Sequence, residues 1–153
     1  MKITVAKKDN LKQLQALYQI LFSDMHRLQP FYYQNGEQNP EFILSMIKGK
    51  RSDFLLAEKE SKLLGFALVQ EVETPSFDCV LPHRYAYLMD LVVHPQFRSH
   101  GIGTLLLNAV KDWARQRRLE YVELTVLHEN AGAIRLYERE SFQETMKTMH
   151  FIL

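Results

Sequence analysis

The sequence predicts a mixed α/β fold in one domain, and three observations carry that prediction. The chain has 153 residues, which is the usual length of one domain and too short for two comfortable ones. In the first half, two strand-like runs flank a short charged turn, so these strands should pair antiparallel. In the second half, strands and helices alternate, with links short enough for right-handed parallel crossovers. We therefore expect residues 1–153 to form a single domain around one mixed sheet.

Apolar periodicity predicts the elements of the first half. Apolar residues three and four positions apart indicate helices, whereas short apolar and β-branched runs indicate strands. Asp9 or Asn10 can cap the first helix, and Pro40 and Gly49 bound the second. In chain order we expect a strand over residues 3–6, helices over 11–21 and 42–47, strands over 53–58 and 63–72, and a loop over 74–82.

The second half contains the parallel part of the sheet. A mostly apolar run over residues 85–93 predicts a strand that is covered on both faces. From Ile102 to Trp113, apolar residues keep helical spacing and predict a helix that begins after Gly101. We then expect a strand over 119–127, a helix over 130–140 and a last strand over 142–151.

Composition excludes several classes of protein. Nineteen basic and eighteen acidic residues leave a formal net charge of +1, so no large field attracts nucleic acid or an anionic membrane. Cys79 is the only cysteine, which excludes an internal disulfide and fits a reducing compartment. The start of the chain lacks the features of a signal peptide, and no run approaches the roughly 18 apolar residues of a membrane span. We expect a cytoplasmic protein that binds neither nucleic acid nor membrane.

The most informative stretch joins the strand at 85–93 to the following helix. Gly101 and Gly103 let main-chain N–H groups converge where the helix dipole adds about half a positive charge. Arg98 can add a full charge, so this turn can cradle a pyrophosphate. A P-loop would need a Gly-Lys-Ser/Thr run, and a dinucleotide fingerprint would need a third glycine where Leu106 stands.

The pattern Arg98-x-x-Gly101-x-Gly103 resembles the acyl-CoA-binding motif of the GNAT N-acyltransferase superfamily. In that family the motif reads Gln/Arg-x-x-Gly-x-Gly/Ala and lies between the fourth strand and the third helix, where its amides hold the CoA pyrophosphate. The order of the expected elements also matches over essentially the whole chain. The resemblance implies a GNAT-type fold, an acetyl-CoA-dependent N-acetyltransferase, and acetyl-CoA as co-substrate. It also implies that the fourth and fifth strands splay apart and admit the thioester.

A second match lies at the fourth helix. Family members often have an Asn at its start, a Tyr seven residues later and a Gly-Phe pair soon after. Asn130, Ala133, Tyr137 and Phe142 fit this pattern, with Ser141 in place of the glycine. A phenol with a pKa near 10 stays protonated at neutral pH and can donate to a departing thiolate. Tyr137 is therefore the candidate general acid, in a direct attack of the amine on acetyl-CoA.

The base that accepts a proton from the amine is less defined. A carboxylate or an ordered water could take this proton, and the candidate carboxylates are Asp90 and Glu71. Asp90 points opposite to Leu91 within an apolar strand, where a carboxylate needs a partner. It could equally be a buried acid satisfied by backbone donors, and Glu71 could be simply exposed. We take Tyr137 and Asp90 as the catalytic set.

The expected cofactor contacts come from three segments. Strand residues would pair main-chain groups with the pantetheine arm, as an added strand pairs with a sheet edge. By resemblance, the N–H of Leu91 or Val92 would polarise the thioester carbonyl, while Thr104 and Asn130 could equally be helix caps. The full set is Leu91, Val92, Val93, Arg98, Ser99, His100, Gly101, Ile102, Gly103, Thr104, Asn130 and Ala133.

The sequence does not identify the acceptor amine. Residues 87–90 resemble a strand of polyamine N-acetyltransferases that often reads Tyr-Leu-Glu-Asp, but Met89 stands in the place of the glutamate. Residues 26–31 resemble a segment that covers the acceptor pocket, and a packing role is equally compatible. A small-molecule amine, a polyamine, an amino acid and a protein N-terminus or lysine all remain open. A homodimer is implied only at the level of the family.

Two kinds of site are not predicted, and one other class of function stays open. His128-Glu129 lacks the second histidine of a zinc motif, and Cys79 with His83 lacks an orienting third group, so we predict no metal and no nucleophilic pair. The rival from another class is a non-catalytic acyl-CoA-binding sensor module. Such a module would keep Arg98 and the glycines but would need neither Tyr137 nor a base.

Overall fold

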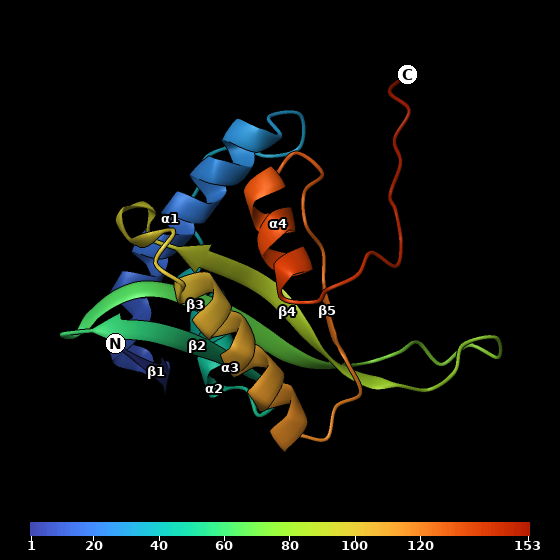
Figure 1. Ribbon diagram of the computed structural model, residues 1–153, viewed down its shortest axis with the longest axis horizontal. Coiled ribbons are helices and arrows are strands. Elements are labelled where there is room, and N and C mark those ends of the chain that lie inside the picture. The colour runs from blue at the N-terminus through green and yellow to red at the C-terminus, as the bar shows by residue number, and fades with distance from the viewer.

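A five-stranded sheet in the order β1-β2-β3-β4-β5 organises the computed structural model, which describes residues 1–153 (Figure 1). The first four strands pair antiparallel and β5 pairs parallel to β4, which confirms the predicted mixed sheet. The strands are β1 (Lys2–Val5), β2 (Ser52–Lys59), β3 (Lys62–Glu73), β4 (Arg84–Val93) and β5 (Val122–Leu124). The helices are α1 (Leu11–Leu28), α2 (Pro40–Lys48), α3 (Ile102–Gln116) and α4 (Ala131–Arg139), with short 3-10 turns at Lys8–Asn10 and Pro95–Phe97.

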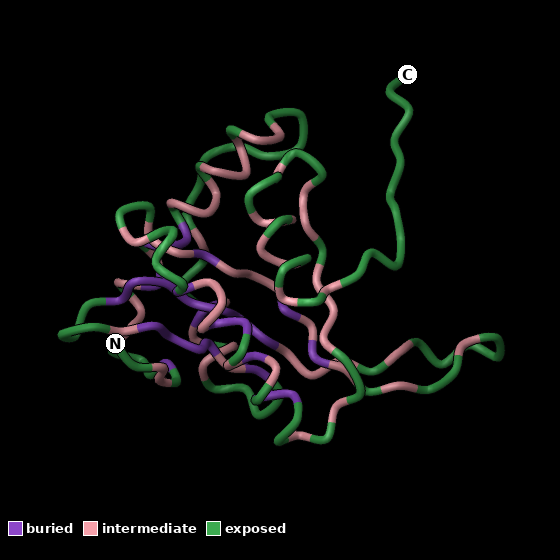
Figure 2. The backbone as a smooth tube through the Cα atoms, in the orientation of Figure 1, coloured by how far each residue is buried: buried purple, intermediate pink, exposed green.

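Helices cover both faces of the sheet and enclose two apolar clusters, and Figure 2 shows that most of the buried backbone lies in the central strands. On the face of α1 and α2, the rings of Tyr18, Phe54 and Phe66 are fully buried against one another. On the other face, α3 buries Leu106 and Val110 completely. Burial of one such side chain contributes about 1.5–3 kcal/mol, so both clusters hold the central strands firmly.

Local signals explain where the first helices begin. Pro40 is the first residue of α2, and the Asn39 side chain accepts a hydrogen bond from the Glu41 N–H at 2.8 Å. Asn10 precedes α1 as predicted, but its side chain accepts the Lys7 N–H at 2.8 Å and makes no cap bond to α1. The polar residue therefore fixes the short 3-10 turn before α1.

A bulge in β4 re-aims the side chains near its middle. Two successive residues of β3, Leu68 and Val69, face Asp90 and Leu88, so Met89 has no partner across the ladder. As a result, Met89 and Asp90 both lie on the face covered by α1, where Met89 packs against the apolar cluster. In a regular strand these two neighbours would point to opposite faces.

β4 and β5 diverge soon after they begin to pair. Residues 86–88 of β4 pair with residues 122–124 of β5, whereas β4 continues alone to Val93. The divergence confirms the splayed strands that the resemblance implied. It also makes β5 shorter than the strand predicted over 119–127, because a strand exists only where a neighbour bonds to it.

The strand predicted over residues 142–151 is absent, and this prediction was wrong. Residues 143–153 make no main-chain hydrogen bond, and Figure 1 shows them leaving the body of the molecule as an extended tail. Alternating polar and apolar residues favour a strand, but the chain does not bring this segment alongside any other strand. We call residues 143–153 the C-terminal tail.

Candidate active site

Asp90 lies on β4 just past the bulge, near the point where β5 leaves. The buried hydroxyl of Tyr18 in α1 donates a hydrogen bond to Asp90 Oδ2 at 2.7 Å. Asp90 is thus satisfied by a side chain and not by the backbone donors that one sequence interpretation supposed. Burial raises the pKa of Asp90 above its ordinary range, and the hydrogen bond from Tyr18 offsets part of that rise. The carboxyl group therefore gains and loses its proton at a pH closer to neutral than an exposed aspartate does.

Tyr137 is held by the turn that ends α4. The N–H of Phe142 donates to the carbonyl of Tyr137 at 2.9 Å, and that of Ser141 donates to the carbonyl of Glu138 at 3.0 Å, the pattern of a Schellman motif. Ser141 has φ of 71°, the left-handed conformation that glycine usually adopts there. The ring of Phe142 packs edge-on against Tyr137 with centroids 5.8 Å apart. The serine therefore preserves the turn that a glycine would form.

Tyr137 and Asp90 lie close enough for their charges to interact. Burial, and after it the negative charge of Asp90, raise the pKa of Tyr137 to about 12. The phenol therefore keeps its proton at neutral pH more firmly than a free tyrosine does. The structure brings the two predicted catalytic side chains together, although one comes from β4 and the other from α4.

The turn before α3 offers unpaired donors. Gly101 has φ of 79° and stands in open space, with no atom within 4 Å of an added Cβ. The N–H groups of residues 102–104 form the first turn of α3 and have no acceptor in the chain. They point outward at the positive end of the helix dipole, which is the arrangement that binds phosphate oxygens. Ile102 itself is buried in the α3 cluster, so only its main chain faces this site.

Arg98 is engaged by the protein itself. Its Nε donates to the Val93 carbonyl at 2.9 Å, and its Nη2 donates to Asp24 Oδ2 at 2.8 Å. Ser99 follows in the left-handed conformation with φ of 63°, and His100 Nδ1 lies 2.7 Å from the Arg98 carbonyl. Both Ser99 and His100 are exposed beside the first turn of α3. The guanidinium is therefore oriented beside the turn but already carries one anionic partner.

Gly103 and Thr104 join α3 to α4. A Cβ on Gly103 would stand 2.8 Å from Leu136 Cδ2, so this glycine permits close packing of the two helices. The absence of a side chain at Gly103 therefore serves helix packing. Thr104 Oγ1 donates to Glu140 Oε1 at 3.0 Å, and Lys111 Nζ donates to the Glu140 carbonyl at 2.8 Å. The side chain of Thr104 is committed to this contact.

Asn130 acts as the cap of α4. Its Oδ1 accepts the N–H of Ala133 at 3.1 Å, so the side chain makes the helix cap that was one of its two predicted roles. The same bond occupies the main-chain donor of Ala133. Together with the Schellman motif at its other end, this cap defines the length of α4 and the position of Tyr137.

The free segment of β4 presents main chain, not side chains, toward the gap left by β5. Val92 is buried in the α1 cluster, whereas Leu91 and Val93 pack against the α3 cluster on the other face. Beyond Leu88 no strand pairs with β4 on the side of β5, and the Val93 carbonyl accepts only from Arg98 on that side. This edge is open to an extended ligand.

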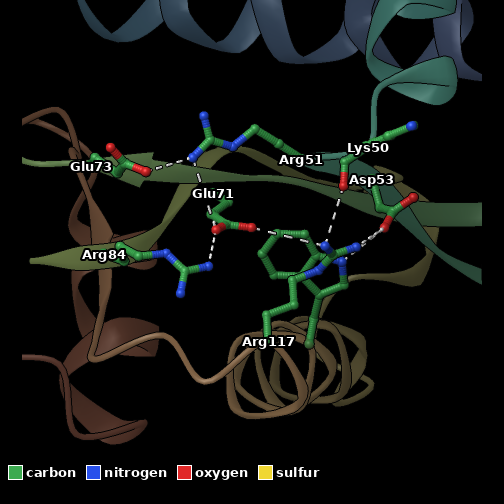
Figure 3. Close-up of polar contacts among 8 residues, drawn as sticks. Lys50, Arg51, Asp53, Glu71, Glu73, Arg84 and Arg117 are labelled. Carbon is green, nitrogen blue, oxygen red and sulfur yellow. Dashed lines mark hydrogen bonds and ion pairs between the residues drawn. The ribbon is translucent and has the colours of Figure 1, made fainter.

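Glu71, the second candidate base, lies at the opposite end of the sheet among arginines (Figure 3). It faces Ala86 across the ladder, and Arg84 donates a hydrogen bond to its carboxylate. Arg51 and Arg117 each lie 4.0 Å from a Glu71 oxygen. The hydrogen bond from Arg84 and then the charges of the three arginines lower the pKa of Glu71. A carboxylate held in this way is a poor proton acceptor.

Sequence reasoning missed two residues of α1. Tyr18 lies within the helix predicted over residues 11–21, and the folded chain makes it the partner of Asp90, 72 positions away. Asp24 was not singled out, yet it binds Arg98 across 74 positions. Neither contact has a local sequence signal. A phenol on an otherwise aliphatic stripe is the one hint, because a buried tyrosine hydroxyl needs a partner.

Comparison with known proteins identifies the family. The sequence matches the acetyltransferase (GNAT) family over residues 14–142. The uncharacterized N-acetyltransferase YhfO of Bacillus subtilis is 33% identical over 125 residues, covering 80% of this chain and 81% of the relative. An uncharacterized N-acetyltransferase of Methanocaldococcus jannaschii is 30% identical over 142 residues, covering 90% of this chain and 58% of the relative.

Solved structures agree on the fold. A mutant of the BH1408 protein from Bacillus halodurans superposes with a TM-score of 0.95 at 21% identity over 100% of both chains. An aminoglycoside N-acetyltransferase in complex with CoA superposes with a TM-score of 0.74 at 18% identity, over 99% of this chain and 98% of that one. The chain belongs to the acetyltransferase (GNAT) family, which confirms the predicted fold and the predicted class of enzyme.

Two further findings bear on partners. None of the helices is both long and apolar enough to cross a membrane. No group of three or more His, Cys, Asp or Glu side chains is arranged to hold a metal ion.

Proposed function

We propose that this chain transfers an acetyl group from acetyl-CoA to a primary amine by direct attack within a ternary complex. The observation that carries the proposal is the pairing of a half-buried carboxyl group, Asp90, with a nearby phenol, Tyr137, where β4 and β5 diverge. Acyl transfer to an amine needs a proton acceptor near the nitrogen and a proton donor near the sulfur. These two side chains supply one group of each kind.

The N-terminal turn of α3 would hold the pyrophosphate of the coenzyme. Three unpaired N–H groups and the helix dipole favour an anion there, and the left-handed Gly101 forms the turn that exposes them. Arg98 would add its charge, with its ion pair to Asp24 shared or exchanged for phosphate oxygens. The exposed Ser99 and His100 flank this turn and would contact the ligand from its rim.

The free edge of β4 would bind the pantetheine arm through its main chain. An extended amide-containing ligand can pair with an open strand as a further strand does. The N–H of Leu91 or Val92 would then polarise the thioester carbonyl and stabilise the oxyanion that forms on attack. The side chains of Leu91, Val92 and Val93 would contribute packing alone, because they are turned to the two core faces.

Asp90 would accept the proton that the amine nitrogen loses. Its raised pKa brings proton uptake nearer to neutral pH, where the carboxylate is a stronger base than an exposed aspartate. Tyr18 holds the carboxylate in one orientation and leaves its other oxygen free to receive a proton, directly or through water. As the nitrogen–carbon bond forms, the proton passes from nitrogen to Asp90.

Tyr137 would donate to the sulfur as the carbon–sulfur bond breaks. A pKa of about 12 lies above that of an ordinary thiol near 8.5, so the phenol acts mainly as a strong hydrogen-bond donor to the developing thiolate. The proton finally gained by sulfur is balanced by the one lost from nitrogen. Asp90 thereby accepts the proton that nitrogen loses, and Tyr137 stabilises the sulfur that finally gains one.

The acceptor is proposed only as a primary amine. The names of relatives point to different amines, since they include an N-alpha-acetyltransferase 60 of Danio rerio and a thialysine N-epsilon-acetyltransferase of Mus musculus. Met89, in the bulge beside Asp90, supplies no second carboxylate for a polyamine. The single half-buried acid Asp90 suits one amino group in the acceptor site.

The test is release of free thiol from acetyl-CoA by the purified chain with a panel of amines. The panel contains a polyamine, an aminoglycoside, a lysine-containing peptide and peptides with free N-termini, and calorimetry follows acetyl-CoA binding in parallel. We expect binding by calorimetry and amine-dependent thiol release that Asp90→Asn slows by about 10²-fold or more. Absence of acetyl-CoA binding contradicts the proposal, and tight binding without thiol release from any amine supports the acyl-CoA sensor instead.

A further inference from the structure

The paired ends of β4 and β5 carry a further group of polar side chains, on the sheet face opposite α3. On the α3 face, every second residue of this segment packs in or against the apolar cluster, namely Ala86, Leu88, Val122 and Leu124. Alternation along each strand therefore turns Tyr85, Tyr87 and Glu123 to the opposite face. Asp90 lies on that face too, because of the bulge at Met89. The three residues thus share a face with the proposed base.

Glu123 lies among aromatic rings. It stands beside Tyr87 in the parallel ladder. Tyr85, two residues before Tyr87, stacks on Tyr121 with ring centroids 4.8 Å apart and an interplanar angle of 8°. Burial, and after it the negative charge of Glu123, raise the pKa of Tyr85. The carboxylate is therefore near two rings, those of Tyr85 and Tyr87, and Tyr121 holds the first of them in place by stacking.

Glu123 lacks a cation, unlike other acids near this end of the sheet. Glu71 and Glu73 each bind an arginine, and Glu120 lies 2.8 Å from His83. Glu123 is half-buried, yet it forms no ion pair and no side-chain hydrogen bond. A partly desolvated carboxylate without a partner gains from binding a cation, and tyrosine rings attract an ammonium group to their faces. These side chains are therefore complementary to an alkylammonium group.

This part of the sheet is open to a small ligand. α1 packs against β3 and β4, α2 packs against β2, and the helix that packs on β5 is α3, on the opposite face. β5 also forms one edge of the sheet (Figure 1). Tyr85, Tyr87 and Glu123 are all partly exposed, so a cation can reach them from solvent.

The strand register gives the distance from this group to Asp90. Asp90 faces residue 68 of β3 and Tyr87 faces residue 70, so the two lie about 7 Å apart along the strands. Glu123 is one strand further, about 5 Å across, which puts the Cα atoms of Asp90 and Glu123 about 8–9 Å apart. An extended aliphatic chain advances about 1.25 Å per bond, so about five methylene groups between two nitrogens span about 7.5 Å.

We propose that Tyr85, Tyr87 and Glu123 form a second cation site, which holds a protonated amino group of the acceptor while another amino group of the same molecule reacts beside Asp90. The acceptor is then an aliphatic amine with a second amino group, as in a diamine or a polyamine. Met89 leaves Asp90 as the one acid at the reacting nitrogen, and Glu123 supplies a second carboxylate from the neighbouring strand. This inference rests on the proposed function, because it places the second amino group relative to the reacting one.

The first experiment compares three acceptors of matched length by thiol release from acetyl-CoA. Cadaverine carries a second amino group, and aminopentanol and hexylamine carry a hydroxyl and a methyl group in its place. We expect kcat/KM for cadaverine to exceed the other two by about 10-fold or more, the effect of one charge-assisted hydrogen bond. Glu123→Gln is expected to reduce this preference to within about two-fold, through a higher KM for cadaverine.

The matched control is Glu120→Gln, which removes the same charge from a carboxylate that already binds His83. This control is expected to keep the preference for cadaverine. A wild-type chain that acetylates hexylamine as well as cadaverine, or a preference that Glu123→Gln leaves intact, overturns the second cation site and leaves the proposed function standing.

The second experiment measures binding without turnover. Calorimetry follows cadaverine titrated into the full chain in the presence of CoA, which supplies no acetyl group. We expect binding that weakens about 10-fold in Glu123→Gln and several-fold in Tyr87→Leu, with most of the affinity restored in Tyr87→Phe, which keeps the ring. Melting temperatures check that each variant is folded. Binding that depends on Glu123 without thiol release from any amine contradicts the proposed function and keeps the second cation site, whereas no cadaverine binding to the wild-type chain overturns the site.

Discussion

Two carboxyl groups on neighbouring strands of one sheet, Asp90 and Glu71, lie in surroundings that shift their pKa values in opposite directions. Asp90 is half-buried and receives a single side-chain hydrogen bond, from a phenol, so desolvation raises its pKa and that bond offsets only part of the rise. Glu71 has a side chain that is 10% exposed and is held by Arg84, with Arg51 and Arg117 nearby, so its pKa is lowered. Desolvation dominates at the first residue, whereas hydrogen bonding and charge dominate at the second.

The difference separates a proton acceptor from a structural anchor. At neutral pH an ionised Asp90 has lost hydration without a cationic partner in return, so it gains from taking up a proton or binding an ammonium group. Glu71 gains nothing from either, because the three arginines already stabilise its charge (Figure 3). Both residues are acids within the same β3–β4 ladder, and only their surroundings assign them different roles.

The largest expected effect comes from replacing Tyr137, whose pKa is raised in part by the charge of Asp90. We expect Tyr137→Phe to lower kcat by about 10²–10⁴-fold with little change in the affinity for acetyl-CoA, because donation to the sulfur is made only in the transition state. Steady-state kinetics and calorimetry measure the two quantities. Tyr121→Phe is the control, since Tyr121 stacks on Tyr85 at the far end of the sheet. Wild-type turnover of Tyr137→Phe across the pH range would remove Tyr137 from the mechanism.

Asp90→Asn is expected to reduce kcat by about 10²-fold or more and yet to raise the melting temperature at pH 7. The pKa of Asp90 is raised in the folded protein, so ionising Asp90 lowers the free energy of unfolding. This cost is complete above the folded pKa. An amide keeps the bond from Tyr18 and removes that cost. The gain in melting temperature should fade as pH falls below the ordinary value of 3.8, where both folded and unfolded chains are protonated. Calorimetric scans at several pH values check this, and a loss of stability at pH 7 would contradict it.

Glu71→Gln should give the reverse pattern. Its folded pKa is lowered, so its contribution to stability is present above its ordinary pKa of 4.5 and is lost as pH falls through the folded pKa. We expect a loss of about 1 kcal/mol at pH 7, near the upper end for partly exposed ion pairs, and little loss in acid. Turnover should stay within about two-fold of wild type. A large fall in kcat with unchanged stability would instead place Glu71 in the catalytic machinery.

The same comparison shows what the sequence could reveal. Periodicity placed the helices and the first four strands, because amphipathic faces follow from local spacing. The Arg98-Gly101 turn and the pattern from Asn130 to Tyr137 were visible because they lie within single short segments. Whether Asp90 or Glu71 was the better base was not visible, because the answer depends on Tyr18 and Arg84, which reach these carboxylates only in the folded chain.

The prediction of a last strand was wrong for a related reason. Residues 142–151 have a strand-like composition, and composition says nothing about which edge a strand will join. The length of β5 was overestimated likewise, since the predicted strand over 119–127 needed a partner that β4 provides only to Leu88. Pairing is a property of the neighbours in space.

The smallest expected effect concerns the turn that positions Tyr137 beside Asp90. Ser141 adopts φ of 71°, a conformation that costs an L-residue roughly 1 kcal/mol and costs glycine little. The greater flexibility of glycine in the unfolded chain returns part of this gain, so Ser141→Gly should stabilise the fold by about 0.5 kcal/mol. Ser76→Gly, in the exposed loop between β3 and β4, is the matched control and should not stabilise. Kinetics should be unchanged, because the hydrogen bonds from residues 141 and 142 to α4 are main-chain bonds that glycine keeps. A fall in kcat with Ser141→Gly would mean that the serine side chain, and not only the turn, acts on Tyr137.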